Sequence, residues 1–231
     1  MITVFRDFLQ LFFPRYCLAC QQQVLTPSEV LLCTSCAYTL PQANVHNAQD
    51  RDIMHKLYSQ LPISHACAMY RLRKGGGVQR LVYALKYGNK PQVGLFLGKK
   101  YGTVLRSVPW HQDWDLIVPV PLHSARLRQR GYNQSSLFAQ GLSTVLEVPW
   151  SDDCLRRTRN TKTQTKKSRL ERLCNVEGAF CVTNPERVAG QHVLLVDDVV
   201  TTGATLSACA ATLVAHGVRA VSIAALAVAD S

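Results

Sequence analysis

The stretch that most constrains the fold is VLLVDDVVTTGATL, residues 193–206. An apolar run leads into two adjacent carboxylates, Asp197 and Asp198, and a turn rich in threonine and glycine follows. Continuous apolar strands are typical of parallel sheets that are buried on both faces. Ligands bind such sheets where loops leave the carboxyl ends of the strands. We therefore expect the carboxylate pair at the ligand-binding edge of an α/β sheet.

The rest of the chain alternates apolar strands with amphipathic helices. Strands are predicted at residues 65–72, 115–120, 192–197 and 220–228, and helices at 78–88, 133–147 and 203–217. This alternation predicts a parallel sheet covered by helices on both faces. The 231 residues, 47% hydrophobic and 18% charged, describe one large or two small globular domains. No apolar run approaches the length of about 18 residues that a membrane span needs.

The turn after the carboxylates has the chemistry of a phosphate cradle. Free N–H groups and the positive dipole end at the start of a helix favour a phosphate. Gly203 lets the backbone approach the ligand closely, and the threonine hydroxyls add donors. Two carboxylates accept hydrogen bonds from vicinal hydroxyls, so the site is shaped for a ribose 5-phosphate. The candidate residues are Asp197, Asp198, Thr201, Thr202, Gly203, Ala204 and Thr205.

Three other interpretations explain this stretch less well. A Walker B strand requires a G-x-x-x-x-G-K-[ST] loop, and GLFLGKK at Gly94 to Lys100 has only three residues between its glycines and lies in a helix-like stretch. A phosphoaspartate site accounts for one carboxylate but not for the cradle. A structural turn capped by Asp and Thr seldom needs both carboxylates and three threonines.

Positive charge is concentrated in one part of the chain. The formal net charge is +11, and residues 122–172 hold eleven Lys or Arg against four acids. We expect an anion to bind there, although any single cation can equally be a solvated surface residue. Arg126, Arg128 and Arg130 follow a strand that ends at Val120 and precede a polar helix start. The polar segment from Arg156 to Arg172 lacks apolar periodicity until Leu170, which suits a mobile loop.

Four cysteines near the N-terminus have metal-ligand spacing. They form the pattern C-x2-C-x12-C-x2-C, which allows two knuckles to close one tetrahedral zinc site. Two redox pairs or four free thiols are the alternatives, but a redox C-x-x-C normally begins a helix of a thioredoxin-like unit. The predicted zinc ligands are Cys17, Cys20, Cys33 and Cys36.

Residues 193–206 resemble the motif that binds 5-phosphoribosyl 1-pyrophosphate (PRPP) in type I phosphoribosyltransferases. The resemblance implies a parallel sheet with helices on both sides, a hood for the acceptor, a pyrophosphate loop and a mobile catalytic loop. It implies that Asp197 and Asp198 face the ribose hydroxyls and that Thr201 to Thr205 hold the 5-phosphate, with magnesium as cofactor. Arg126, Arg128 and Arg130 then bind pyrophosphate, and Lys166, Lys167 and Arg169 are the catalytic candidates.

The cysteine pattern, LKYG at 85–88, RQRGYNQS at 128–135, the segment 161–180 and the PRPP motif occur in one order. Together they resemble the ComF family of competence proteins. The resemblance implies PRPP binding associated with DNA uptake in natural transformation, on the cytoplasmic side, with a ComFA-type helicase as partner. The expected domains are 1–45, an N-terminal helix and zinc knuckle, and 46–231, with a hood at 46–110 and a PRPP-binding core at 111–231.

Two other functions stay open at this point. One is an active phosphoribosyltransferase of nucleotide metabolism or salvage with an unknown acceptor; the other is a non-catalytic module that binds single-stranded DNA. A single-strand groove normally adds stacking aromatics to its cations, and residues 122–172 contain only Tyr132, Phe138 and Trp150. The apolar residues 5–13 could pack on the knuckle, or could contact a partner or the inner face of the membrane.

Overall fold

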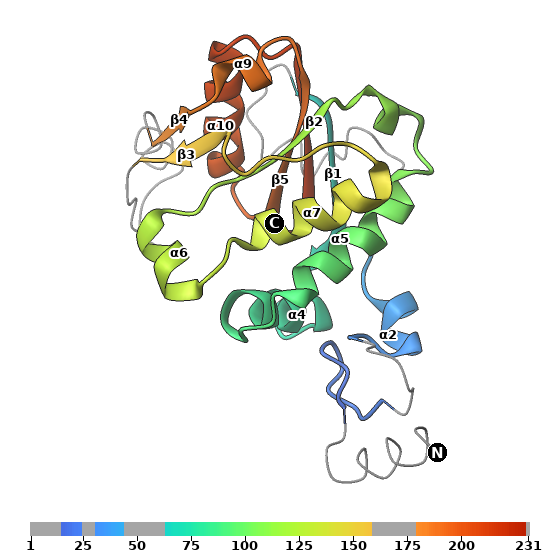
Figure 1. The fold of residues 1–231 in the computed structure, drawn as a ribbon. Helices are drawn as coiled ribbons and strands as arrows, with labels where there is room; N and C mark the ends of the chain where they lie inside the picture. The colour runs from blue at the N-terminus through green and yellow to red at the C-terminus, as the bar shows by residue number, and fades with distance from the viewer. Residues whose placement is uncertain (1–14, 25–30, 44–62, 159–178, 230–231) are drawn as a thin grey trace, which may run out of the picture.

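The computed structural model describes residues 15–24, 31–43, 63–158 and 179–229. Its centre is a four-stranded sheet in which all neighbouring strands are parallel (Figure 1). The predicted strands and their alternation with helices are confirmed. In sheet order the strands are β1 (Ile63–Leu72), β6 (Ala220–Ala229), β5 (His192–Val200) and β2 (Leu116–Pro119).

Strand β5 continues further than the sequence suggests. Its apolar residues pair with β6, and the ladder runs on through Asp197, opposite Ala225, to Val200, opposite Val228. The prediction that the strand ends at residue 197 is therefore wrong by three residues. The reason is that the long apolar β6 offers backbone partners beyond the carboxylates.

Three helices cover one face of the sheet: α4 (Gly77–Tyr87), α5 (Gln92–Leu105) and α7 (Gln134–Leu146). Helices α5 and α7 lie side by side and cross at two glycines. A Cβ atom added to Gly98 would lie 2.9 Å from the Cα of Gly141. This approach brings Phe138 and Leu142 into the core beneath α5.

The opposite face carries α10 (Ala204–Ala215). Its buried residues Leu206, Cys209 and Leu213 belong to the same core as Leu195 and Ile223 of the sheet. The antiparallel pair β3 (Leu155–Arg157) and β4 (Phe180–Val182) and the short α9 (Pro185–Val188) also lie on this side (Figure 1). Among the described residues, no helix is both long and apolar enough to cross a membrane.

Two short helices flank β2: the 3-10 helix η1 (Pro109–Asp113) precedes it, and α6 (Ser124–Arg130) follows it. The sequence predicts a loop where α6 lies. The helix forms because His123 Nδ1 accepts a hydrogen bond from the Ala125 N–H at 3.2 Å, and Gly131 ends the helix with φ of 80°.

The N-terminal cysteine segment, residues 15–24 and 31–43, packs on α4 and beside strand β1. It includes the short helix α2 (Thr34–Thr39). The backbone after α2 runs beside β1, where the Ala43 N–H donates to the Met69 carbonyl at 3.0 Å. Strand β1 shares the sheet with β5 and β6, so part of residues 46–110 belongs to the central core. The hood role of these residues stays a prediction.

Candidate functional site

The two carboxylates lie within the last four residues of β5, and each is held by a side chain from a helix. Ser135 Oγ, in the first turn of α7, donates to Asp197 Oδ1 at 3.0 Å. Lys86 Nζ, in the last turn of α4, forms an ion pair with Asp198 Oδ1 at 2.9 Å. The Asp198 backbone N–H also donates to Asp197 Oδ1 at 2.8 Å. These contacts fix the positions of the Asp197 and Asp198 carboxylates, whose oxygens can accept hydrogen bonds from a ligand.

Asp197 is difficult to ionise in this setting. Burial, followed by repulsion from Asp198, raises its pKa to about 7, although Lys86 and the hydrogen bond from Ser135 act in the opposite direction. Near neutral pH the Asp197 carboxyl thus exists in both protonation states. It can accept a hydrogen bond from a ligand hydroxyl when ionised and can donate one when protonated.

The predicted phosphate cradle lies between β5 and α10. Gly203 caps α10 with φ of 75°, a left-handed conformation that glycine adopts readily. A glycine has no side chain to cap the helix, so the first N–H groups of α10 are left for a ligand or water. Thr201 is exposed, and Thr202, Ala204 and Thr205 are partly exposed. The structure thus brings the carboxylates and the cradle together at one edge of the sheet.

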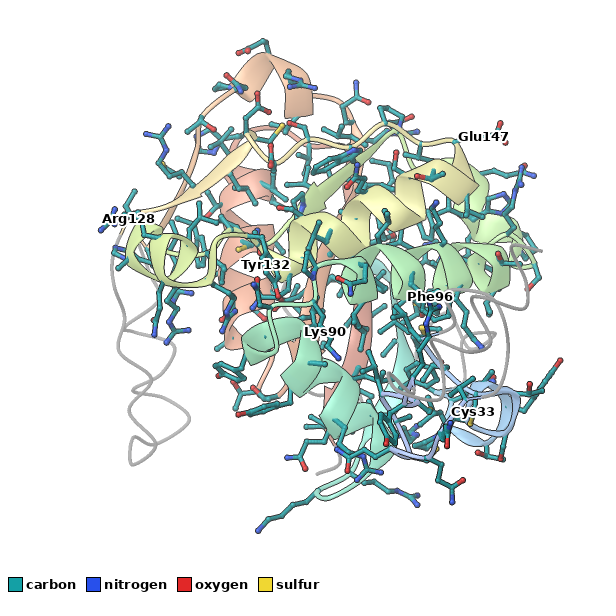
Figure 2. All side chains as sticks on the ribbon, turned by 60° about the horizontal axis from the view of Figure 1, so that its bottom comes forward. Cys33, Lys90, Phe96, Arg128, Tyr132 and Glu147 are labelled. Carbon is teal, nitrogen blue, oxygen red and sulfur yellow. The ribbon has the colours of Figure 1, made fainter. Side chains whose placement is uncertain are left out.

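The three predicted pyrophosphate arginines lie on α6, and the structure gives them different surroundings. Arg130 stacks with its guanidinium carbon 5.2 Å from the centre of the Tyr87 ring. Arg128 is exposed on the outer part of α6 (Figure 2). Burial, then the charge of Arg126, lowers the pKa of Arg157, whereas Asp197 raises it. Arg126 and Asp197 therefore both lie within electrostatic reach of Arg157 on β3.

A groove of about 860 Å³ lies between α6, α7 and β3. Its lining combines the α6 cap His123 with Tyr132, Ser136, Trp150 and Arg157. The Tyr132 hydroxyl donates to the Leu85 carbonyl at 2.6 Å, which joins the start of α7 to α4. The predicted catalytic residues Lys166, Lys167 and Arg169 lie outside the described residues.

The sequence did not assign roles to Lys86 and Ser135, the two residues that hold the carboxylates. Both lie in stretches that carry the family resemblance, LKYG and RQRGYNQS. Lys86 is the one basic residue in the last turn of an amphipathic helix, but its partner is 112 positions away in the chain. Only the tertiary structure brings these groups into contact.

The four N-terminal cysteines form one cluster. Their sulfur atoms all lie within 4.8 Å of one another, and Cys20 Sγ and Cys33 Sγ are 3.8 Å apart. A tetrahedral ion with metal–sulfur bonds of about 2.3 Å separates its ligands by about 3.8 Å. The backbone N–H of Cys33 donates to Cys17 Sγ at 3.3 Å, which suits a thiolate. The cluster fits a metal ion.

Comparison with known proteins agrees with this architecture. Residues 133–231 match the phosphoribosyl transferase domain family. That range contains α7, β5, α10 and β6, which together hold Ser135, the carboxylate pair and the cradle. The match confirms the expected fold class.

Several curated relatives are similar to this chain. The DNA utilization protein YhgH of Escherichia coli K12 is 43% identical over 146 residues, which cover 62% of this chain and 63% of that protein. Competence protein F of Haemophilus influenzae is 39% identical over 94 residues, covering 40% and 41% of the two chains. Competence protein ComFC of Bacillus subtilis is 38% identical over 102 residues, covering 44% and 39%. The matched region thus spans less than two thirds of each relative.

Solved structures of phosphoribosyltransferase-related enzymes also match. The glutamine PRPP amidotransferase of Bacillus subtilis, solved with ADP and GMP, is 20% identical. The match covers 62% of this chain and 30% of that chain, with a TM-score of 0.41. Residues 133–231 thus match the phosphoribosyl transferase domain family, a four-cysteine cluster precedes them in the chain, and parts of the chain are similar to the YhgH and ComF/ComFC proteins.

Proposed function

We propose that this protein binds PRPP with magnesium and that this binding serves DNA uptake in natural transformation. One observation carries the proposal: two carboxylates, held by Lys86 and Ser135, directly precede a helix capped by Gly203. Paired carboxylates suit vicinal ribose hydroxyls, and the free N–H groups at the helix start suit a 5-phosphate.

Each part of PRPP has a proposed partner. Asp197 and Asp198 accept hydrogen bonds from the ribose hydroxyls. The N–H groups at the start of α10, with the hydroxyls of Thr201, Thr202 and Thr205, bind the 5-phosphate. The pyrophosphate, with its magnesium ion, binds to the arginines of α6 and to Arg157.

Lys86 makes the adjacent carboxylates compatible with folding before the ligand arrives. Two adjacent carboxylates, of which Asp198 is buried and Asp197 partly exposed, repel each other, and a paired ammonium offsets part of this repulsion. When PRPP binds, the ribose hydroxyls share Asp198 with Lys86, since a carboxylate offers about four acceptor positions. Lys86 thus belongs to the binding site although it is not in the PRPP motif.

The names of the relatives support the biological part of the proposal. They are called DNA utilization protein and competence protein. We place the protein on the cytoplasmic side of DNA uptake, with a ComFA-type helicase as partner and zinc in the cysteine cluster. Catalytic turnover is a further proposal. The phosphoribosyl group would pass to an acceptor bound under a hood at residues 46–110, and Lys166, Lys167 or Arg169 would stabilise the leaving pyrophosphate.

Calorimetry with PRPP, ribose 5-phosphate and pyrophosphate, each with magnesium, tests the proposal. PRPP should bind most tightly, because it alone engages the carboxylates, the cradle and the arginines together. Ribose 5-phosphate should bind more weakly at the same site and compete with PRPP. No saturable binding of PRPP by the wild-type protein would refute the proposal. A pyrophosphate-release assay across nucleobases then decides whether turnover occurs.

A further inference from the structure

The last turn of helix α4 is held by two residues that lie between the starts of α6 and α7 in the chain. The Tyr132 hydroxyl donates to the Leu85 carbonyl at 2.6 Å, although the two residues are 47 positions apart. The Arg130 guanidinium carbon lies 5.2 Å from the centre of the Tyr87 ring. Figure 2 labels Tyr132 and, in the loop after α4, Lys90. The stretches LKYG and RQRGYNQS therefore meet at the end of α4.

The hydrogen bond from Tyr132 satisfies a backbone group at the end of the helix. Carbonyl groups in the last turn of an α-helix lack the N–H partner that the next turn would supply. The Gly88 N–H, just past α4, donates to the Ala84 carbonyl at 3.0 Å. The Tyr132 hydroxyl serves the next carbonyl, that of Leu85. A side chain of α7's leading segment thus fixes the backbone where α4 ends.

Lys86 directly follows Leu85 and connects this turn to the carboxylates. Its Nζ pairs with Asp198 Oδ1 at 2.9 Å. A lysine ammonium sits on a flexible four-carbon stem, so its position depends on the backbone that carries it. The carbonyl end of a helix also bears partial negative charge. Without the ammonium, Asp198 would lie near this negative end with less compensation.

We infer that Tyr132 is a positioning residue for the candidate ribose site. It acts through Leu85 and Lys86 and not by contact with the ribose: its hydroxyl fixes the last turn of α4, and this turn holds the Lys86 ammonium at Asp198. The inference rests on the proposed function, because the site that Tyr132 positions is the one proposed for PRPP.

The position of Lys86 affects the ionisation of the neighbouring carboxyl. Within the described part of the chain, the charged and titratable groups that act on Asp197 or respond to it are Asp198, Lys86, Arg157 and Cys209. Burial, followed by Asp198, raises the pKa of Asp197 to about 7, and Lys86 opposes this rise. Displacement of Lys86 therefore moves the ionisation of Asp197, which creates an acceptor for a ribose hydroxyl, to higher pH.

Carbon-13 NMR titration of the Asp197 carboxyl in the ligand-free protein tests the inference without PRPP. Lys86→Met removes the ammonium and should lower the ionisation constant of Asp197 by roughly tenfold. Tyr132→Phe keeps the ring and removes only the hydroxyl. It should lower the same constant by roughly two- to fivefold, because the effect is bounded by the worth of one hydrogen bond.

The double variant Lys86→Met with Tyr132→Phe separates positioning from a purely structural role. If Tyr132 acts through Lys86, its hydroxyl should have no further effect on Asp197 once the ammonium is gone. Tyr38→Phe, at a 79% exposed position on α2, is the control and should leave Asp197 unchanged. An Asp197 ionisation constant in Tyr132→Phe equal to that of the wild type, even with a lower melting temperature, would overturn the inference. An undiminished effect of Tyr132→Phe in the Lys86→Met background would do so too.

Calorimetry with PRPP and magnesium relates the same variants to the proposed function. At pH 7, Tyr132→Phe should weaken PRPP binding by roughly two- to fivefold. The difference from wild type should shrink at pH 8.5, where Asp197 is ionised in both proteins; an equal difference at the two pH values would contradict the inference. If the wild type binds no PRPP, the proposed function fails, whereas a changed Asp197 ionisation in Tyr132→Phe would still support the positioning of Lys86.

Discussion

At the scale of single residues, Asp197 links ionisation to stability. Its pKa in the folded protein is about 7 against an ordinary 3.8, because burial and Asp198 oppose its charge. The folded protein thus holds a proton that the unfolded chain has released, so stability falls as pH rises from about 4 to 7. We expect Asp197→Asn to raise the melting temperature at pH 8 by a few degrees and to change it little at pH 4. A lower melting temperature than wild type at pH 8 would contradict this account.

His192 makes a contribution of opposite sign. It is buried at the start of β5, where its Nε2 lies 2.8 Å from Ser222 Oγ. Burial, then the charge of Arg219, lowers its pKa below 6.5. The unfolded chain binds the proton more readily, so this contribution to stability is lost as pH falls below about 6.5. His192→Gln should flatten the loss of stability between pH 7 and 5, measured by urea unfolding; an unchanged slope would count against it.

At the scale of elements, the crossing of α5 and α7 positions the start of α7, and with it Ser135. A side chain on Gly98 would overlap the Phe138 carbonyl oxygen, a backbone atom that cannot move alone. Gly98→Val should therefore destabilise the protein by about 3 kcal/mol in urea unfolding. The exposed Thr103 on the same helix is the control, and Thr103→Ala should change stability by no more than about 0.5 kcal/mol. Equal stability of the two variants would contradict the close-packed crossing.

The elements also show what the sequence could and could not predict. Helix α4 was predictable because Val78, Leu81, Val82 and Leu85 recur at helical spacing, and all four are buried. Helix α6 was not, because its three arginines and exposed Leu127 carry no apolar stripe and its limits depend on the His123 cap and on Gly131. The end of β5 was missed for a different reason: it depends on backbone partners in β6, which a single strand does not reveal.

At the scale of the whole molecule, the cysteine segment is part of the fold rather than an appendage. Leu40 packs against Gly77, where an added Cβ would lie 2.8 Å from Leu40 Cδ2. Lys100 Nζ donates to the Ala37 carbonyl at 3.0 Å. The spacing of the cysteines predicted their cluster. Their docking on α4 and α5 could not be predicted, because it depends on contacts between residues about 60 positions apart in the chain.

We expect a metal ion bound by the four cysteines to stabilise the docked segment, and chelation tests this. Protein purified without chelator should contain about one zinc per chain. Chelation should lower the melting temperature and increase proteolysis near the cysteines. PRPP affinity should stay within about twofold, because Asp198 contacts the last turn of α4 whereas the cysteine segment contacts its first half. Absence of zinc by elemental analysis would contradict the assignment of the cysteine cluster. A loss of PRPP binding on chelation would show that the two regions are coupled.

The most direct test of the PRPP site is calorimetry on the double variant Asp197→Asn with Asp198→Asn. A matched control, Glu147→Gln with Glu186→Gln, removes the same charge from exposed positions outside the groove. Loss of two charge-assisted hydrogen bonds of about 1.5–3 kcal/mol each should weaken PRPP binding more than about 100-fold. The control should bind as the wild type does, and both variants should remain folded. If the double variant binds PRPP as tightly as the wild type, the carboxylate pair is not the ribose site and the central claim is wrong.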